Sequence, residues 1–180
     1  GLSESINVTV AANGVVSMTM SNISSLSDLN SYGWSLGSTP TSLTFGTGMA
    51  VGMPLSGAKY RCDFKMADTN HPVVLNVGTY QYFAIEMDEP GNGSQKLDTP
   101  KGDYGNYPTG ILNSANGRSV LYWNLQAKSY FPTNGVSDQL TIFQVKMADV
   151  TVAPYSYTIY WVHTFKTLND LNAFIANEQK

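Results

Sequence analysis

The clearest pattern of apolar and polar positions lies near the C-terminus, between Pro154 and Asn177. Its first part is rich in β-branched and aromatic residues, which are typical of a β-strand. On a period of two, one face carries the heavier side chains, and we assign it to the core: Tyr157, Ile159, Trp161, His163 and Phe165. The opposite face carries Ser156, Thr158, Tyr160, Val162 and Thr164.

The period then changes from that of a strand to that of a helix. Thr167 is a helix-capping residue type, and Asp170 follows three positions later. Apolar residues repeat at helical spacing at Leu168, Leu171, Phe174 and Ile175. The sequence therefore predicts a strand that leads directly into a short C-terminal helix docked on the core.

With this strand included, short alternating runs along the chain predict roughly eight to ten strands, with turns supplied by 16 glycines and 8 prolines. Two segments have the composition of loops, namely Asn22 to Asn30 with Leu26 and Leu29 as anchors, and the long stretch from Asp88 to Gly117. Long loops in a compact domain are commonly functional. We expect an all-β fold, an antiparallel jelly-roll β-sandwich with a short C-terminal helix, as a single domain over residues 1–180.

Composition argues against several classes of function. The net charge of −3 comes from 10 basic and 13 acidic residues without a long run of either sign, so no basic stripe is available for nucleic acid. No apolar stretch reaches the ~18 residues of a membrane span. Cys62 is alone, which excludes an internal disulfide, and we interpret it as a core residue.

The predicted location follows from the same composition. Few charges with abundant Ser, Thr, Asn, Gly and Tyr are typical of secreted or surface β-domains. The chain begins with Gly1 and Leu2, which is not a natural start, so we expect that a signal peptide has been removed. The predicted location is extracellular or at the outer cell surface.

Four core-strand motifs resemble those of a known group of proteins: Tyr82–Met87, Leu121–Leu125, Phe143–Val150 and Tyr157–Thr167. Their succession looks like an uncharacterised family of Bacteroidetes surface domains. Members of that family are similar to galactose-binding-like jelly rolls and occur beside glycoside hydrolases and other glycan-utilisation proteins. The resemblance covers roughly the C-terminal 100 residues. It implies a fold and a glycan-related setting, and no ligand-binding residue is carried over from it.

The sequence offers few catalytic groups. His71 stands in a predicted turn, and His163 lies in the last strand, where we interpret it as a packing residue. No nucleophile elbow, metalloprotease helix motif or glycine-rich phosphate loop is present. A small hydrolase would need carboxylates that converge in a cleft, whereas Glu86, Asp88 and Glu89 are more simply a solvated strand end. We therefore expect no enzymatic activity.

We expect no required cofactor, but calcium remains open. Asp88, Glu89 and Asp98, together with loop carbonyls, are the hard oxygen ligands that calcium prefers.

Carbohydrate binding needs flat aromatic faces together with amides or carboxylates. The segment from Asp98 to Pro108 provides Tyr104 and Tyr107 among glycines, with Asp103 and Asn106 beside them. Further aromatic pairs are Tyr32 with Trp34, and Tyr130 with Phe131. The alternative is that loop tyrosines pack down as plugs over the ends of the sandwich.

The sequence thus predicts a non-catalytic carbohydrate-binding accessory module of a glycan-utilisation protein, with a polysaccharide or oligosaccharide as its partner. The alternative is a structural spacer or protein-interaction domain on the cell surface, which positions a neighbouring catalytic domain or surface protein. The two hypotheses differ in whether an aromatic pair lies exposed on a loop end or on a concave sheet face.

Overall fold

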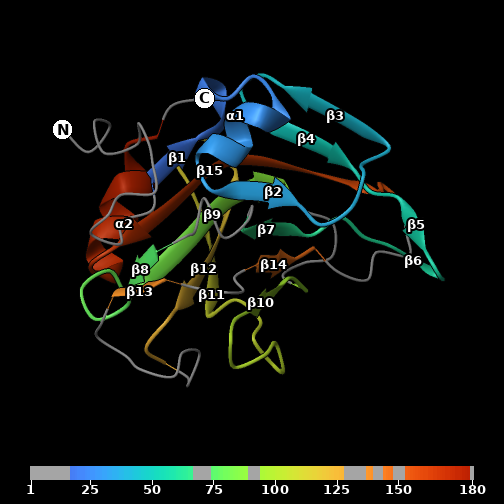
Figure 1. Cartoon of the computed structure of the whole chain (residues 1–180). Coiled ribbons are helices and arrows are strands. Elements are labelled where there is room, and N and C mark those ends of the chain that lie inside the picture. The colour runs from blue at the N-terminus through green and yellow to red at the C-terminus, as the bar shows by residue number, and fades with distance from the viewer. Residues whose placement is uncertain are drawn as a thin grey trace.

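The computed structural model describes residues 17–66, 74–88, 94–127, 137–139, 144–147 and 153–178. Within these residues the chain forms two facing antiparallel sheets, and a helix covers the outer face of the larger sheet (Figure 1). The larger, seven-stranded sheet has the order β11 (Gly110–Asn113), β12 (Ser119–Asn124), β9 (Tyr82–Asp88), β15 (Ser156–Phe165), β4 (Met49–Gly52) and β3 (Ser42–Phe45), with β1 (Ser17–Thr19) paired to β15. The smaller, four-stranded sheet has the order β10 (Lys96–Asp98), β14 (Gln144–Lys146), β7 (Phe64–Met66) and β2 (Trp34–Leu36).

Two ribbons and three helical segments complete the described part of the chain. The ribbons are β5 (Leu55–Ser56) with β6 (Lys59–Tyr60), and β8 (Val74–Asn76) with β13 (Ser137–Gln139). The helical segments are the 3-10 turn η2 (Met20–Asn22) and the helices α1 (Leu26–Ser31) and α2 (Leu168–Ala176). The predicted antiparallel β-sandwich with a short C-terminal helix is confirmed.

The main core lies between the two sheets. From the larger sheet, Phe83, Ile85 and Trp123 point into it, because every second residue of β9 and β12 faces inward. From the smaller sheet, Trp34 and Phe64 stack with their ring centroids 4.5 Å apart. The facing rings of the two sheets hold the sandwich together by burying apolar surface.

A buried hydrogen bond also joins β15 to the segment that precedes β7. The hydroxyl of Tyr157 donates to the carbonyl oxygen of Cys62 at 2.7 Å. Burial raises the pKa of Tyr157 well above its ordinary value, so this hydroxyl stays a donor. Cys62 itself is buried, as the sequence predicted.

β15 carries a bulge at Tyr160. On the neighbouring strand β9, Met87 lies opposite Ile159 and Glu86 lies opposite Trp161, so Tyr160 is an additional residue in the ladder. Because side chains alternate along a strand, one extra residue reverses the face to which the following side chains point.

The bulge divides the apolar side chains of β15 between two cores. Tyr157 and Ile159 before it and Val162 after it belong to the main core, whereas Trp161 and Phe165 lie on the opposite face. The predicted single core face from Tyr157 to Phe165 is therefore wrong, because the period of two is broken at the bulge. Trp161 is nonetheless only 4% exposed.

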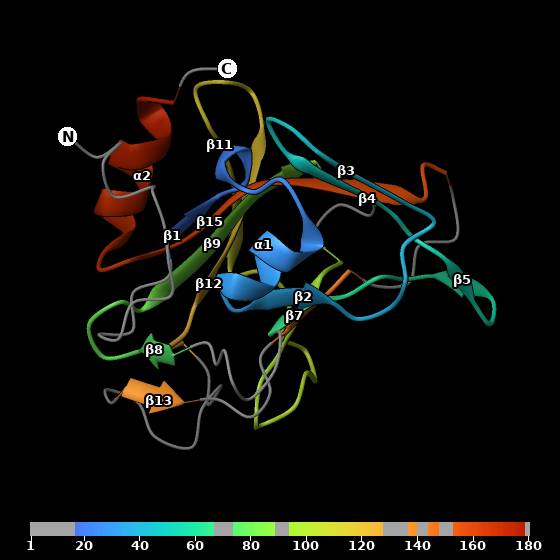
Figure 2. The same ribbon diagram turned by 45° about the horizontal axis from the view of Figure 1, so that its top comes forward.

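Helix α2 covers the second face of the larger sheet (Figure 2). The side chain of Thr167 accepts a hydrogen bond from the backbone N–H of Asp170 at 3.0 Å, which is the predicted cap. Phe174 meets Trp161 edge-on, with centroids 5.2 Å apart. The buried residues of the helix are Leu171, Phe174 and Ile175. The helix is therefore docked on the sheet, as its apolar spacing predicted.

A buried carboxyl group lies beside the C-terminal end of α2. Glu86 is only 1% exposed, and the guanidinium of Arg118 lies 3.6 Å from its Oε1. The amide of Asn116 donates to Glu86 at 3.3 Å and to Glu178 at 2.7 Å, and the indole N–H of Trp161 donates to Glu178. The interpretation of Glu86 as part of a solvated strand end is therefore wrong, because α2 and the turn before β12 cover it.

Glu178 keeps a proton at neutral pH in this setting. Burial, followed by the hydrogen bond and the negative charge of Glu86, raises the pKa of Glu178 to about 8. One proton between the two carboxyl groups relieves the repulsion that two adjacent carboxylates would have.

Two segments predicted as loops contain regular elements. In the segment from Asn22 to Asn30, Ser25 accepts a hydrogen bond from the N–H of Asp28 and starts α1, which buries Leu29. The segment from Asp88 to Gly117 contains β10 and β11. These strands have only three and four residues, so alternation within each is too short to recognise among the surrounding glycines and prolines.

Trp161→Ala is expected to lower the free energy of unfolding by about 3–5 kcal/mol, because it leaves a cavity between the larger sheet and α2. Urea denaturation followed by tryptophan fluorescence and circular dichroism measures this change. Tyr104→Ala, at a fully exposed ring, is the matched control and should change stability by less than about 0.5 kcal/mol. An unchanged midpoint for Trp161→Ala would contradict the packing described here.

Protein stability is expected to fall as the pH rises from about 5 to about 8. In this range the folded protein holds a proton on Glu178 that the unfolded chain has already released, because the folded pKa is the higher one. Melting temperatures across this range measure the effect. Glu178→Gln cannot ionise and should flatten the profile, and a slope identical to that of the wild type would exclude Glu178 as its source.

Candidate functional site

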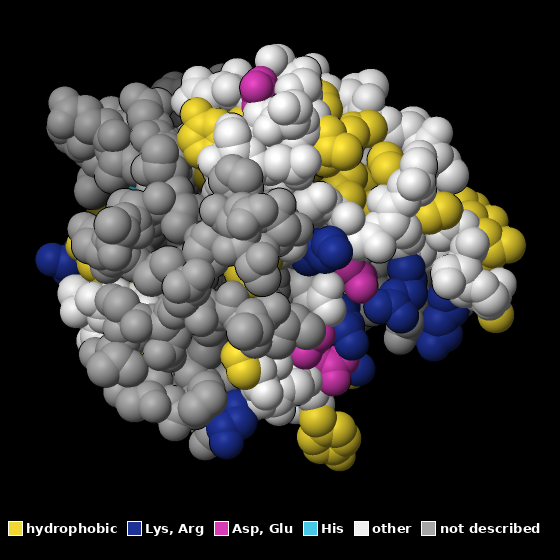
Figure 3. Space-filling model, viewed as in Figure 1, with side chains coloured by type: hydrophobic (Ala, Val, Ile, Leu, Met, Phe, Trp, Pro, Cys, Tyr) yellow, Lys and Arg dark blue, Asp and Glu magenta, His cyan; other side chains and the backbone are white. Residues whose placement is uncertain are grey.

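The outer face of the smaller sheet is polar. Phe64, Leu97 and Val145 are fully buried in the main core, so their neighbours along β7, β10 and β14 point away from it. We call these neighbours the polar face: Lys65, Lys96, Asp98, Gln144 and Lys146. In the space-filling view, charged side chains of both signs gather on the side of the molecule that carries these strands (Figure 3).

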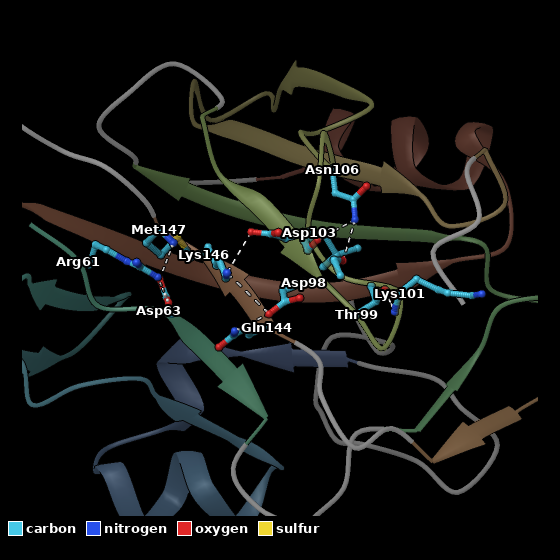
Figure 4. A network of polar contacts seen from close by, with 12 residues as sticks. Arg61, Asp63, Asp98, Thr99, Lys101, Asp103, Asn106, Gln144, Lys146 and Met147 are labelled. Atoms are coloured by element: carbon cyan, nitrogen blue, oxygen red, sulfur yellow. Dashed lines mark hydrogen bonds and ion pairs between the residues drawn. The ribbon is translucent and has the colours of Figure 1, made fainter. Parts of the chain in front are cut away.

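A network of polar contacts connects the polar face to the turn that follows β10 (Figure 4). The ammonium group of Lys146 lies 3.0 Å from Oδ2 of Asp103 and 3.9 Å from Oδ2 of Asp98. The amide of Gln144 donates to the same oxygen of Asp98 at 2.7 Å. The hydrogen bond from Lys146 holds the pKa of Asp103 below its usual value, so Asp103 is an anion at neutral pH.

The turn formed by residues 99–106 is held by Asn106. Backbone hydrogen bonds run both ways between Thr99 and Gly102, at 3.2 and 2.8 Å. The side-chain amide of Asn106 donates to the carbonyl oxygens of Leu97 and Gly102, each at 3.1 Å, and the backbone oxygen of Asn106 accepts from the indole of Trp123. Asn106 is buried, so the structure gives it a supporting role in place of the predicted contact with a ligand.

Two tyrosines lie on or beside this turn. Tyr104 is 98% exposed and stands between Gly102 and Gly105, whose φ angles of 92° and 68° favour glycine. Tyr107 is 48% exposed, and the ammonium group of Lys96 lies 5.4 Å from its ring centroid. Tyr104 is therefore not a plug over the end of the sandwich, and the turn presents its ring to solvent.

The second predicted aromatic pair does not form a surface. Trp34 is 0% exposed because it points inward from β2 and stacks on Phe64. Tyr32 is half-buried and packs against the main core. The third pair, Tyr130 and Phe131, lies outside the described residues.

Two of the three predicted calcium ligands are described, and they lie in different sheets. Asp88 ends β9 of the larger sheet and accepts a hydrogen bond from the hydroxyl of Tyr160 at 2.5 Å, whereas Asp98 belongs to the smaller sheet. Glu89 lies outside the described residues. Among the described residues, no group of three or more His, Cys, Asp or Glu side chains is placed to hold a metal ion.

Of the two histidines, His163 is described by the structure. His163 is buried, and its ring stacks on Phe165 with centroids 4.2 Å apart, which agrees with a packing role. His71 lies outside the described residues.

Sequence reasoning missed the lysines and the glutamine of the polar face. The signal was present, because Lys96, Gln144 and Lys146 flank residues that are strongly apolar. It was not recognised because the segment that contains β10 was assigned to a loop.

Two further findings bear on identity. No helix in the described ranges is long and apolar enough to cross a membrane. The family model with the description "Domain of unknown function (DUF4979)" matches residues 19–171, which include both sheets, the polar face and the turn 99–106. The chain has no match among curated proteins or solved structures.

Asn106→Ala is expected to lower the free energy of unfolding by about 1–3 kcal/mol, because it leaves the buried carbonyl oxygen of Leu97 without its side-chain donor. The carbonyl oxygen of Gly102 loses one of two donors and keeps the backbone N–H of Thr99. Urea denaturation measures this loss. Asp103→Asn, at a partly exposed position on the same turn, is the control and should have a smaller effect. Equal stability of Asn106→Ala and the wild type would show that Asn106 does not hold the turn.

Proposed function

This chain belongs to the DUF4979 family, and we propose that it is a non-catalytic carbohydrate-binding module. Its site is the polar face together with Tyr104 and Tyr107. The observation that carries the proposal is the full exposure of Tyr104 on a turn whose conformation is fixed from within.

An exposed ring on a fixed turn is suited to bind a flat apolar partner. The faces of pyranose rings carry C–H groups that stack on aromatic side chains, and burying both surfaces releases water. Because Asn106 and the two glycines already hold the turn, little conformational entropy is lost when a ligand binds Tyr104. The exposed ring of Tyr104 contributes nothing to the core, so the binding of a ligand is the physical reason that we propose for its exposure.

The neighbouring polar groups fit the hydroxyls of a sugar. Asp103 and Gln144 offer a carboxylate and an amide oxygen on the same side of the smaller sheet as the turn, whereas Asp98 is buried and holds Gln144 and Lys146. Each such oxygen accepts more than one hydrogen bond. A sugar hydroxyl can therefore join this network without breaking the contacts with Lys146.

The setting of the module follows from the resemblance of its core strands. We place it outside the cell or on the outer surface of a Bacteroidetes cell, as an accessory domain of a glycan-utilisation protein. The resemblance to surface domains that occur beside glycoside hydrolases and the low content of charged residues support this placement.

A spacer or protein-interaction domain is the second candidate function, and one observation favours it. Leu55 at the β5–β6 ribbon is 59% exposed. Close by, the rings of Tyr60 and Tyr155 stack with centroids 3.7 Å apart, and Tyr155 is also exposed. An apolar projection of this kind suits contact with a neighbouring protein.

The double variant Tyr104→Ala/Tyr107→Ala is expected to lose the retardation of the wild type in native gels that contain a bound polysaccharide. Each aromatic contact is worth about 0.5–1.5 kcal/mol, so the dissociation constant should rise about 5- to 140-fold. Because a small shallow site binds in the micromolar to millimolar range, this change removes visible binding. The melting temperature should stay close to that of the wild type.

Tyr155→Ala is the matched control, since it removes an exposed ring from the β5–β6 region. It should keep polysaccharide binding. Loss of binding in Tyr155→Ala with retention in the double variant would move the site to the ribbon. Failure of the wild type to bind any polysaccharide of a broad panel, with recovery of a defined protein partner, would favour the spacer.

A further inference from the structure

Positive charge is concentrated on the polar face and the turn 99–106. The chain as a whole has a net charge of −3. The described residues of this surface instead carry four positive and two negative side chains, namely Lys65, Lys96, Lys101 and Lys146 against Asp98 and Asp103. The surface therefore has the opposite sign to the rest of the molecule, which attracts anions.

Both aspartates form ion pairs with the same lysine. Lys146 forms the ion pairs with Asp98 and Asp103. Within the described ranges, Lys65, Lys96 and Lys101 take part in no ion pair. Lys65 and Lys101 thus have no anionic partner among the described residues, whereas Lys96 attracts Asp103 from beyond ion-pair distance and helps to lower the pKa of Asp103.

Lys96 and Lys146 are held close together by the register of the smaller sheet. They lie directly opposite each other on β10 and β14, on the same outer face. Like charges in this arrangement repel each other. Asp103 relieves part of the repulsion through its hydrogen bond from Lys146 and its weaker attraction to Lys96. This lysine pair destabilises the sheet and buries no apolar surface in the core. Such a pair is expected where a bound anion neutralises the two positive charges.

We propose that this site binds anionic glycans, in which a carboxylate or sulfate group of the sugar contacts Lys96 and Lys65. The inference rests on the proposed function, because it names the class of glycan that the same surface takes. The ammonium group of Lys96 lies 5.4 Å from the ring centroid of Tyr107. A pyranose ring stacked on a tyrosine here brings its charged substituent to the lysine beside it.

Two matched pairs of polysaccharides test the inference, since the members of each pair share one backbone. Dextran and dextran sulfate test the sulfate group, and highly methyl-esterified and de-esterified homogalacturonan test the carboxylate. Affinity electrophoresis ranks the four, and calorimetry gives dissociation constants at ionic strengths of about 0.02 M and about 0.3 M. The wild type should bind the anionic member of at least one pair about tenfold more tightly than the neutral member, and this preference should shrink at the higher ionic strength.

The variant Lys65→Gln/Lys96→Gln should lower the preference to less than about threefold, because it should weaken binding of the anionic member more than binding of the neutral member. Lys166→Gln is the matched control, because it removes one positive charge between β15 and α2, away from the polar face. It should leave the preference unchanged. Tyr104→Ala/Tyr107→Ala should weaken binding of both members of a pair.

Three outcomes overturn the inference. Equal binding of the neutral and anionic members overturns it while the proposed function stands. A preference that survives Lys65→Gln/Lys96→Gln shows that the anion binds elsewhere on the protein. A preference that falls equally in Lys166→Gln shows that the attraction depends on the overall charge and not on a particular site. Absence of binding to all four polysaccharides and to a broader neutral panel overturns the proposed function itself.

Discussion

The bulge at Tyr160 is the constraint on which the arrangement of layers depends. It lets one strand, β15, supply Ile159 and Val162 to the main core and Trp161 to the contact with α2. The extra residue is held from three sides. The Tyr160 ring packs against Gly48, so closely that a Cβ added to Gly48 would lie 2.8 Å from the ring. The guanidinium of Arg118 lies 3.6 Å from the ring centroid, and the Tyr160 hydroxyl donates a hydrogen bond to Asp88. Because these contacts fix the bulge, β15 presents apolar side chains on both faces of the larger sheet.

Burial of both faces of the larger sheet decides where a binding surface can be. The helix α2 packs on one face over β9, β12 and β15, and the smaller sheet packs on the other. The outer side of the smaller sheet carries polar side chains, and the turn 99–106 contacts it through the ion pair of Asp103 with Lys146. The described surface that combines aromatic, amide and charged groups is therefore this outer face and the turn beside it.

Polar residues of similar type serve two separate purposes in this region. Asn106 is buried and satisfies backbone carbonyls, which fixes the turn, whereas Gln144 lies on the outer face and bonds another side chain. The rigid turn holds Tyr104 in place, and the outer side chains surround the space above the sheet. A fixed support beneath adaptable surface groups is the arrangement by which weak, shallow sites gain affinity.

The sequence by itself determined the features that depend on neighbours along the chain. The cap formed by Thr167 and Asp170 and the apolar face of α2 follow from local spacing, whereas the sequence left open whether Tyr104 is exposed or packs down as a plug. Only the tertiary structure decided the features that depend on partners distant in sequence. The bulge at Tyr160 exists only relative to β9, and Asn106 is buried only because Trp123 and Leu97 meet it. Alternation fixes which residues share a face, but the register and the layer packed against each face determine what that face does.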